Sequence, residues 1–230
     1  MFLQEPFEFL IEVFTISSYG LRILVFFILL MKFSKENVFL KLVLILTGAS
    51  LTADILSHIL MKLNKPTLFI ISFYVILELI IIQLIFINSF IFKPILRRIS
   101  TAFITAVSTS LILGLSLYGL NQPFEFLWSI ASIYECVFSF LLSILLILNL
   151  KIDTPELPIE LWVLIGIFVY TTFSIVPLAS FKLRLYNADS ELGATIYEIF
   201  IVTGNVFKDI CFGIYALLLA RKGPRWTTIQ

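Results

Sequence analysis

Charged residues are scarce in this chain of 230 residues. They make up 13% of it, against about 25% in ordinary soluble domains. Hydrophobic residues account for 60% of the chain. This balance excludes an ordinary water-soluble domain and predicts an integral membrane protein that contacts the lipid bilayer.

Other scarcities exclude further classes of protein. The two cysteines, Cys136 and Cys211, lie inside apolar runs, which gives no support to a disulfide framework. A net charge of +1 provides no basic surface for nucleic acid. The chain has neither a glycine-rich phosphate loop nor a GxSxG motif. The sequence therefore does not indicate an enzyme, and no cofactor is predicted.

Long runs of apolar residues make up most of the chain. Each is close to the roughly 20 residues that a helix needs to cross a bilayer, and none shows the alternation of a membrane barrel strand. The predicted helices cover residues 7–31, 38–61, 67–92, 99–119, 124–150, 158–181 and 194–220. We therefore predict an all-α integral membrane protein, a single seven-helix transmembrane bundle over residues 1–230.

Basic residues between the runs indicate how the bundle is oriented. Loops on one side carry ten lysines and arginines, among them Arg97, Arg98 and Arg221, whereas loops on the other side carry four. The positive-inside rule places the richer side in the cytoplasm. The N-terminus is then outside and the C-terminus cytoplasmic. Because Glu5 and Glu8 stand where a signal peptide would be basic, the first run is expected to be retained.

Polar residues within the predicted spans are the candidates for a functional site. Such residues are costly in a bilayer and usually face the bundle interior. Most of them fall in the outer half of their spans, which predicts a polar cavity open to the outside. The candidate residues are Asp54, His58, Tyr74, Glu78, Glu135, Tyr170, Asn205, Lys208 and Asp209.

Several of these residues also allow other interpretations. Asp54 and His58, four positions apart, share a helix face and would serve either as a structural hydrogen-bonded pair or as metal ligands. A single histidine with scattered carboxylates is a poor zinc signature, so the presence of a metal is left undecided. Lys208 would form a buried ion pair with Asp209, Glu78 or Glu135. Alternatively, it would form a Schiff base with retinal and use Glu78 as the counter-ion, although Gly204 stands where microbial rhodopsins carry an acid.

The last two predicted helices resemble a group of uncharacterised small bacterial seven-helix proteins that are often encoded beside histidine kinases. The resemblance covers about a quarter of the chain, and Asp209 replaces the asparagine expected at its position. It rests on Pro158, Trp162, Gly166, Tyr170, Asn205, Lys208, Arg221 and Lys222. The resemblance implies a sensory or signalling module, with a histidine kinase as a candidate partner, and supplies no ligand or catalytic residue.

We therefore expect a receptor-like module of the bacterial cytoplasmic membrane that passes its signal to a separate partner. A small proton- or cation-coupled transporter is the alternative, because acidic residues at mid-depth suit ion coupling. A retinal protein that uses Lys208 is the further alternative. We expect Asp54, His58, Glu78, Glu135 and Lys208 to converge in one cavity.

Overall fold

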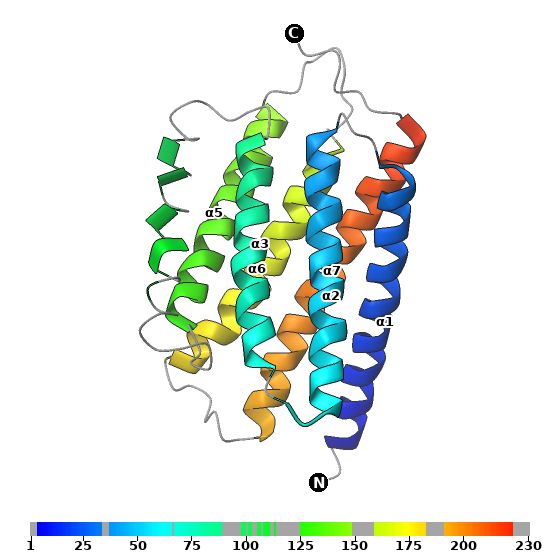
Figure 1. Cartoon of the computed structure of the whole chain (residues 1–230), viewed down its shortest axis with the longest axis vertical. Helices are drawn as coiled ribbons and strands as arrows, with labels where there is room; N and C mark the ends of the chain where they lie inside the picture. The colour runs from blue at the N-terminus through cyan, green and yellow to red at the C-terminus, as the bar shows by residue number, and fades with distance from the viewer. Residues whose placement is uncertain are drawn as a thin grey trace. The chain divides into compact units, whose positions relative to one another are not determined.

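A computed structural model gives the structure of the chain, and every element in the part it describes is a helix. The described residues are 4–33, 37–65, 67–88, 98–99, 101–102, 105–106, 108–110, 113, 125–148, 159–182 and 191–222. The helices in these ranges are α1 (Gln4–Met31), α2 (Val38–Lys62), α3 (Leu68–Asn88), α5 (Glu125–Leu148), α6 (Leu161–Lys182) and α7 (Glu191–Lys222) (Figure 1).

Six of the seven predicted helices correspond to these elements, with ends that differ by a few residues. The predicted helix at 99–119 lies largely outside the described residues, and those of its residues that are described are helical. Asn37 explains why α2 starts where it does, because its side chain accepts a hydrogen bond from the Leu40 amide at 2.8 Å. Such an N-cap satisfies one of the free amides of the first helical turn.

In the part of the chain that the structure describes, four helices are long and apolar enough to cross a membrane. The spans are Glu12–Met31, Val38–Lys62, Phe69–Asn88 and Ile199–Arg221. Shorter apolar stretches cover Ser132–Ile144 on α5 and Leu161–Ile175 on α6. Large apolar side chains are exposed along these helices, including Phe14, Phe27 and Phe73. An exposed apolar surface of this kind is suited to contact with lipid.

The chain divides into two compact units. The first contains α1 up to Ile28, α5 from Ser132 onward, α6 and α7, and the second contains the rest of α1, α2, α3 and the residues up to Ala131. Within the second unit α2 packs along α3.

Two glycines let α6 and α7 approach closely in the first unit. A Cβ atom on Gly166 of α6 would lie 2.9 Å from the Cβ of Cys211. A Cβ atom on Gly204 of α7 would lie 2.9 Å from the Cβ of Phe173. Small residues at helix interfaces in membranes allow this kind of backbone approach. The seam they create fixes the register of α6 against α7 and so determines where the polar side chains of both helices lie.

Candidate functional site

An ion pair joins α1 to α7 inside the first unit. The Nε and Nη2 atoms of Arg22 each lie 3.0 Å from Oδ2 of Asp209. Both residues are almost completely buried, with exposed fractions of 3% and 2%. A buried pair of opposite charges is screened far less than one at a surface. The pair is therefore a strong electrostatic link between two helices that are distant in sequence.

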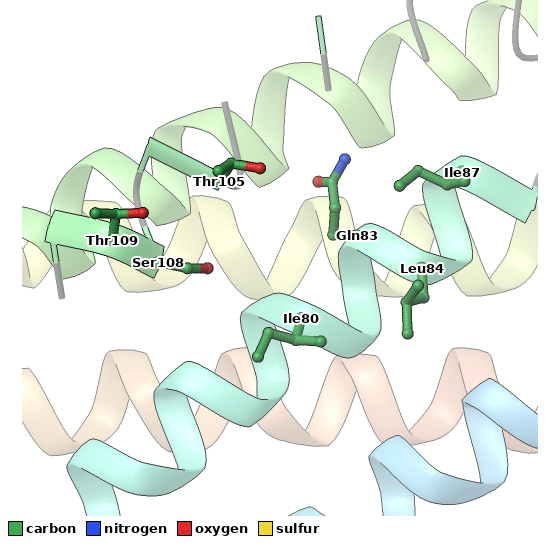
Figure 2. Close-up of a pocket in the computed structure, with 7 residues that line it drawn as sticks. All are labelled: Ile80, Gln83, Leu84, Ile87, Thr105, Ser108 and Thr109. Carbon is green, nitrogen blue, oxygen red and sulfur yellow. The ribbon is translucent and has the colours of Figure 1, made fainter. Parts of the chain in front are cut away.

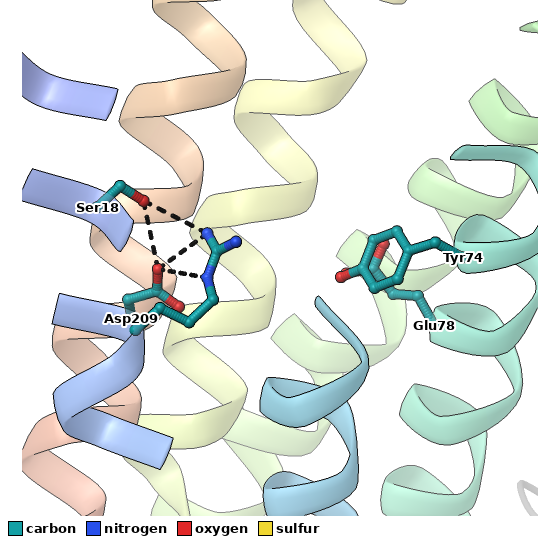
Figure 3. Close-up of polar contacts among 5 residues, drawn as sticks. Ser18, Tyr74, Glu78 and Asp209 are labelled. Carbon is teal, nitrogen blue, oxygen red and sulfur yellow. Dashed lines mark hydrogen bonds and ion pairs between the residues drawn. The ribbon is translucent and has the colours of Figure 1, made fainter. Parts of the chain in front are cut away.

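Ser18 completes this cluster. It lies one helical turn before Arg22, and residues four apart stand one above the other on a helix face. Its Oγ donates to Oδ2 of Asp209 at 3.5 Å and accepts from Nη2 of Arg22 at 3.3 Å. Figure 3 shows Ser18 and Asp209 joined in this way. We call Ser18, Arg22 and Asp209 the α1–α7 cluster.

Lys208, which directly precedes Asp209 on α7, is a second buried basic residue. Its side chain is 2% exposed, and its Nζ lies 3.7 Å from the centre of the Tyr170 ring on α6. A lysine over an aromatic face is stabilised by the ring quadrupole, by about 2 kcal/mol where water is excluded. Consecutive positions on a helix point about 100° apart, so Asp209 bonds to α1 while Lys208 contacts α6. The α7 helix is thus held by charged groups on two sides.

The hydroxyl groups of α5 and α6 are largely engaged by their own helices. Ser139 donates to the Glu135 carbonyl at 2.7 Å, and Ser174 donates to the Tyr170 carbonyl at 2.9 Å. Such back-bonding satisfies a buried hydroxyl without a partner on another helix. Glu135 itself is buried, with 6% of its surface exposed. These serines act in close helix packing, whereas Glu135 places a carboxyl group in the interior.

A separate polar contact lies in the second unit. The Tyr74 hydroxyl donates to Oε1 of Glu78, one turn away on α3, at 2.8 Å. Figure 3 shows the two side chains next to each other on this helix. Glu78 is buried, with an exposed fraction of 4%. A typical hydrogen bond within a protein contributes about 0.5–1.5 kcal/mol to stability. Tyr74 therefore satisfies part of the hydrogen-bonding capacity of a buried carboxyl group.

The structure places the other predicted site residues in varied surroundings. His58 is exposed, whereas Asp54 and Asn205 are half-buried. Tyr170 and Lys208 are in contact, as are Tyr74 and Glu78. The expected convergence in one cavity, which concerns residues of both units, stays a prediction for Asp54, His58, Glu78, Glu135 and Lys208. Within the described ranges, no group of three histidine, cysteine, aspartate or glutamate residues is placed to hold a metal ion.

Ser18 and Arg22 are site residues that the sequence analysis did not select. The available signal was their separation of four positions, with Arg22 as the one charged residue between Val13 and Met31. What the sequence could not give was the partner, because Asp209 lies 187 positions away from Arg22. Only the packing of α1 on α7 determines that pair.

Glu160 is another residue that was not among the predicted site residues, and its pKa is raised. It lies one residue before α6, and its carbonyl accepts from the amides of Val163 and Leu164. Burial raises the pKa of Glu160 from 4.5 to about 7, and a hydrogen bond to its own backbone lowers it in part. The carboxyl group therefore changes charge close to neutral pH.

The raised pKa makes stability depend on pH. Between about pH 4.5 and 7 the folded chain keeps a proton on Glu160 that the unfolded chain releases, so the free energy of unfolding falls as pH rises and levels off above 7. Glu160→Gln removes this dependence. We expect its melting temperature to exceed that of the wild type by several degrees at pH 8 and to match it at pH 4. The exposed Glu12 provides the control, because Glu12→Gln should leave the wild-type pH profile unchanged.

Comparisons with protein-family models, with curated proteins and with solved structures find no match to this chain.

Proposed function

We propose that the chain is a receptor-like seven-helix sensory module of the bacterial cytoplasmic membrane. In this proposal its N-terminus is outside, a polar cavity opens outward, and the signal passes to a separate partner such as a histidine kinase. The observation that carries the proposal is the Arg22–Asp209 ion pair, buried between α1 and α7.

The ion pair supports a functional role because stability alone does not require it. Replacing a buried ion pair by apolar residues of similar size is often neutral or even stabilising. Ionisable residues inside a membrane bundle are also rare and usually serve ligand or ion pathways. Arg22 and Asp209 form a buried ion pair and are also ionisable residues on helices of membrane-spanning length, where each is almost fully buried.

A receptor needs an element with two arrangements and a ligand that favours one of them. The α1–α7 cluster suits this role, because a polar ligand that bonds to Arg22 or Asp209 would compete with their bond to each other. Release of α1 would then alter the position of α7, which ends in the basic residues Arg221 and Lys222. Those residues would lie at the cytoplasmic surface, where a partner can read the change.

A proton- or cation-coupled transporter is the second candidate. It is favoured by the buried carboxyl groups of Glu78, Glu135 and Asp209, which lie on three different helices. Buried carboxyl groups of this kind form the ion or proton pathways of many membrane proteins. A transporter differs from a receptor in that water must reach its site from both sides of the membrane.

Access of water to Asn205 distinguishes these two functions. Asn205 is half-buried on α7, one turn before Asp209. Cys136 and Cys211 are first replaced by alanine, and Asn205→Cys is then treated with a membrane-impermeant thiol reagent from each side. A receptor predicts modification from outside only. Modification from both sides would favour the transporter, and no modification from either side would contradict an aqueous cavity.

Phe207→Cys is the matched control for this experiment. Phe207 is two positions from Asn205 at a similar depth, and 47% of its side chain is exposed on the helix surface. We expect Phe207→Cys to face lipid and to stay unmodified from both sides. Modification of both cysteines would show general access of the reagent and not a cavity.

A further inference from the structure

A pocket of about 360 Å³ lies in the second unit, between α3 and the helical residues Thr105, Ser108 and Thr109. Its volume falls within the range of about 300–1,000 Å³ that is usual for small-molecule sites. The α3 residues that line it are three or four positions apart and so share one helix face. They include the aliphatic side chains of Ile80, Leu84 and Ile87 (Figure 2). One wall of the pocket is therefore apolar.

The polar lining consists of uncharged groups. Gln83 contributes an amide from α3, and Thr105, Ser108 and Thr109 contribute hydroxyl groups. Figure 2 shows the Gln83 amide projecting from α3 into the space beside Thr105. Gln83 is 1% exposed. None of the described lining residues carries a charge, so none of them would compensate a charged ligand.

These groups can both donate and accept hydrogen bonds. The Gln83 amide has two N–H donors and a carbonyl acceptor, and each hydroxyl has one donor and two lone pairs. The Thr105 hydroxyl already donates to the Thr101 carbonyl at 2.8 Å, so it presents lone pairs. A ligand with a hydroxyl group could donate to Thr105 and accept from Gln83.

The position of Gln83 within its helix indicates where such a ligand comes from. It lies five residues before the end of the Phe69–Asn88 span, about 7 Å inside at a rise of 1.5 Å per residue. Ile80 and Leu84 are 37% and 40% exposed, so the apolar wall continues onto the surface that faces lipid. A molecule dissolved in the bilayer can reach the pocket from the side.

We propose that this pocket binds a neutral amphiphile with a hydroxyl-bearing head group, taken from the lipid phase. The aliphatic wall of α3 accommodates the chain, while Gln83 and Thr105 hold the head group. Anionic and cationic lipids are disfavoured, because burying a charge without a partner is costly. The site does not depend on whether the chain is a receptor or a transporter, since it requires only that α3 lies in the membrane.

The test is photolabelling of the full chain in lipid vesicles with a diazirine-bearing monoacylglycerol. We expect unlabelled monoacylglycerol to compete for labelling and phosphatidylglycerol, which is anionic, to compete much less. Gln83→Leu keeps a similar volume but removes the amide. It should lower the competed labelling by about two- to tenfold, as expected for one hydrogen bond worth about 0.5–1.5 kcal/mol.

Asn88→Leu is the matched control. Asn88 is an exposed amide on the same helix that donates to the Leu84 carbonyl and does not line the pocket. Its replacement should leave labelling unchanged. Equal labelling of Gln83→Leu and the wild type, or equal competition by phosphatidylglycerol, would overturn the proposal.

A second variant keeps the test decisive if Gln83→Leu does not fold. Ile80→Phe enlarges a partly exposed side chain that lines the pocket and removes no polar group. We expect it to reduce the competed labelling while the chain remains folded by size-exclusion chromatography. Undiminished labelling of folded Ile80→Phe would exclude the pocket as the site.

Discussion

Replacement of Arg22 by methionine is expected to destabilise the chain by about 3–5 kcal/mol, because it leaves the carboxylate of Asp209 buried without its cation. Asp209 is 2% exposed, so water cannot replace the guanidinium group, and among the residues that the structure describes Ser18 remains as a hydrogen-bond donor to it. The free energy of unfolding in mixed micelles, measured with increasing denaturing detergent, gives this effect directly.

The double variant Arg22→Met/Asp209→Asn should recover most of that loss. It removes both charges, and neutral replacements of a buried ion pair are often tolerated. Arg221→Met is the control, since Arg221 is exposed at the end of α7 and should change stability by less than about 0.5 kcal/mol. Equal losses in the single and double variants would show that the two residues are not coupled.

Introduction of a methyl group at Gly166 is the second large effect that we expect. The new Cβ of Gly166→Ala would lie 2.9 Å from the Cβ of Cys211 and 3.3 Å from the Lys208 carbonyl oxygen. Both are parts of α7 that cannot rotate away, so the helices must separate. Overpacking of this kind costs about 1–3 kcal/mol, and we expect Gly166→Leu to exceed that range.

Gly20 offers a matched control on α1. A Cβ at Gly20 meets nothing within 4 Å, and alanine favours a helix over glycine by about 1 kcal/mol. Gly20→Ala should therefore leave stability unchanged or raise it slightly. Adding Cys211→Gly to Gly166→Ala removes the nearest contact and should restore part of the loss. If Gly166→Ala were as stable as Gly20→Ala, the close packing of α6 on α7 would be wrong.

The helices could be predicted well because lipid permits few alternatives. A long apolar run in a bilayer must satisfy its own backbone, which a helix does, and residues such as Asn37 mark where a run begins. The predicted segment 38–61 therefore differs from α2 by one residue at its C-terminal end. The number of spans and their orientation rest on residues 99–119 and on loops that lie outside the described residues, so these remain predictions.

The site was predictable only in part. Lys208 and Asp209 were selected because charges inside apolar segments stand out in any sequence. Their surroundings were not predictable, since the Arg22–Asp209 bond and the Lys208–Tyr170 contact depend on how three helices pack. The glycines Gly166 and Gly204 set that packing, and a sequence without structure does not show what a glycine touches.

The distance between α1 and α7 tests most directly whether the α1–α7 cluster is the switch of a membrane receptor. Spin labels at Ile16→Cys and Ile210→Cys would lie on exposed positions of the two helices, 62% and 42% exposed, in a chain with Cys136 and Cys211 replaced by alanine. Pulsed electron paramagnetic resonance then gives the distance distribution for the otherwise unchanged chain and for Asp209→Asn. The receptor proposal predicts one main distance in the former and a second, separate population in Asp209→Asn. An identical single distribution in both would contradict it.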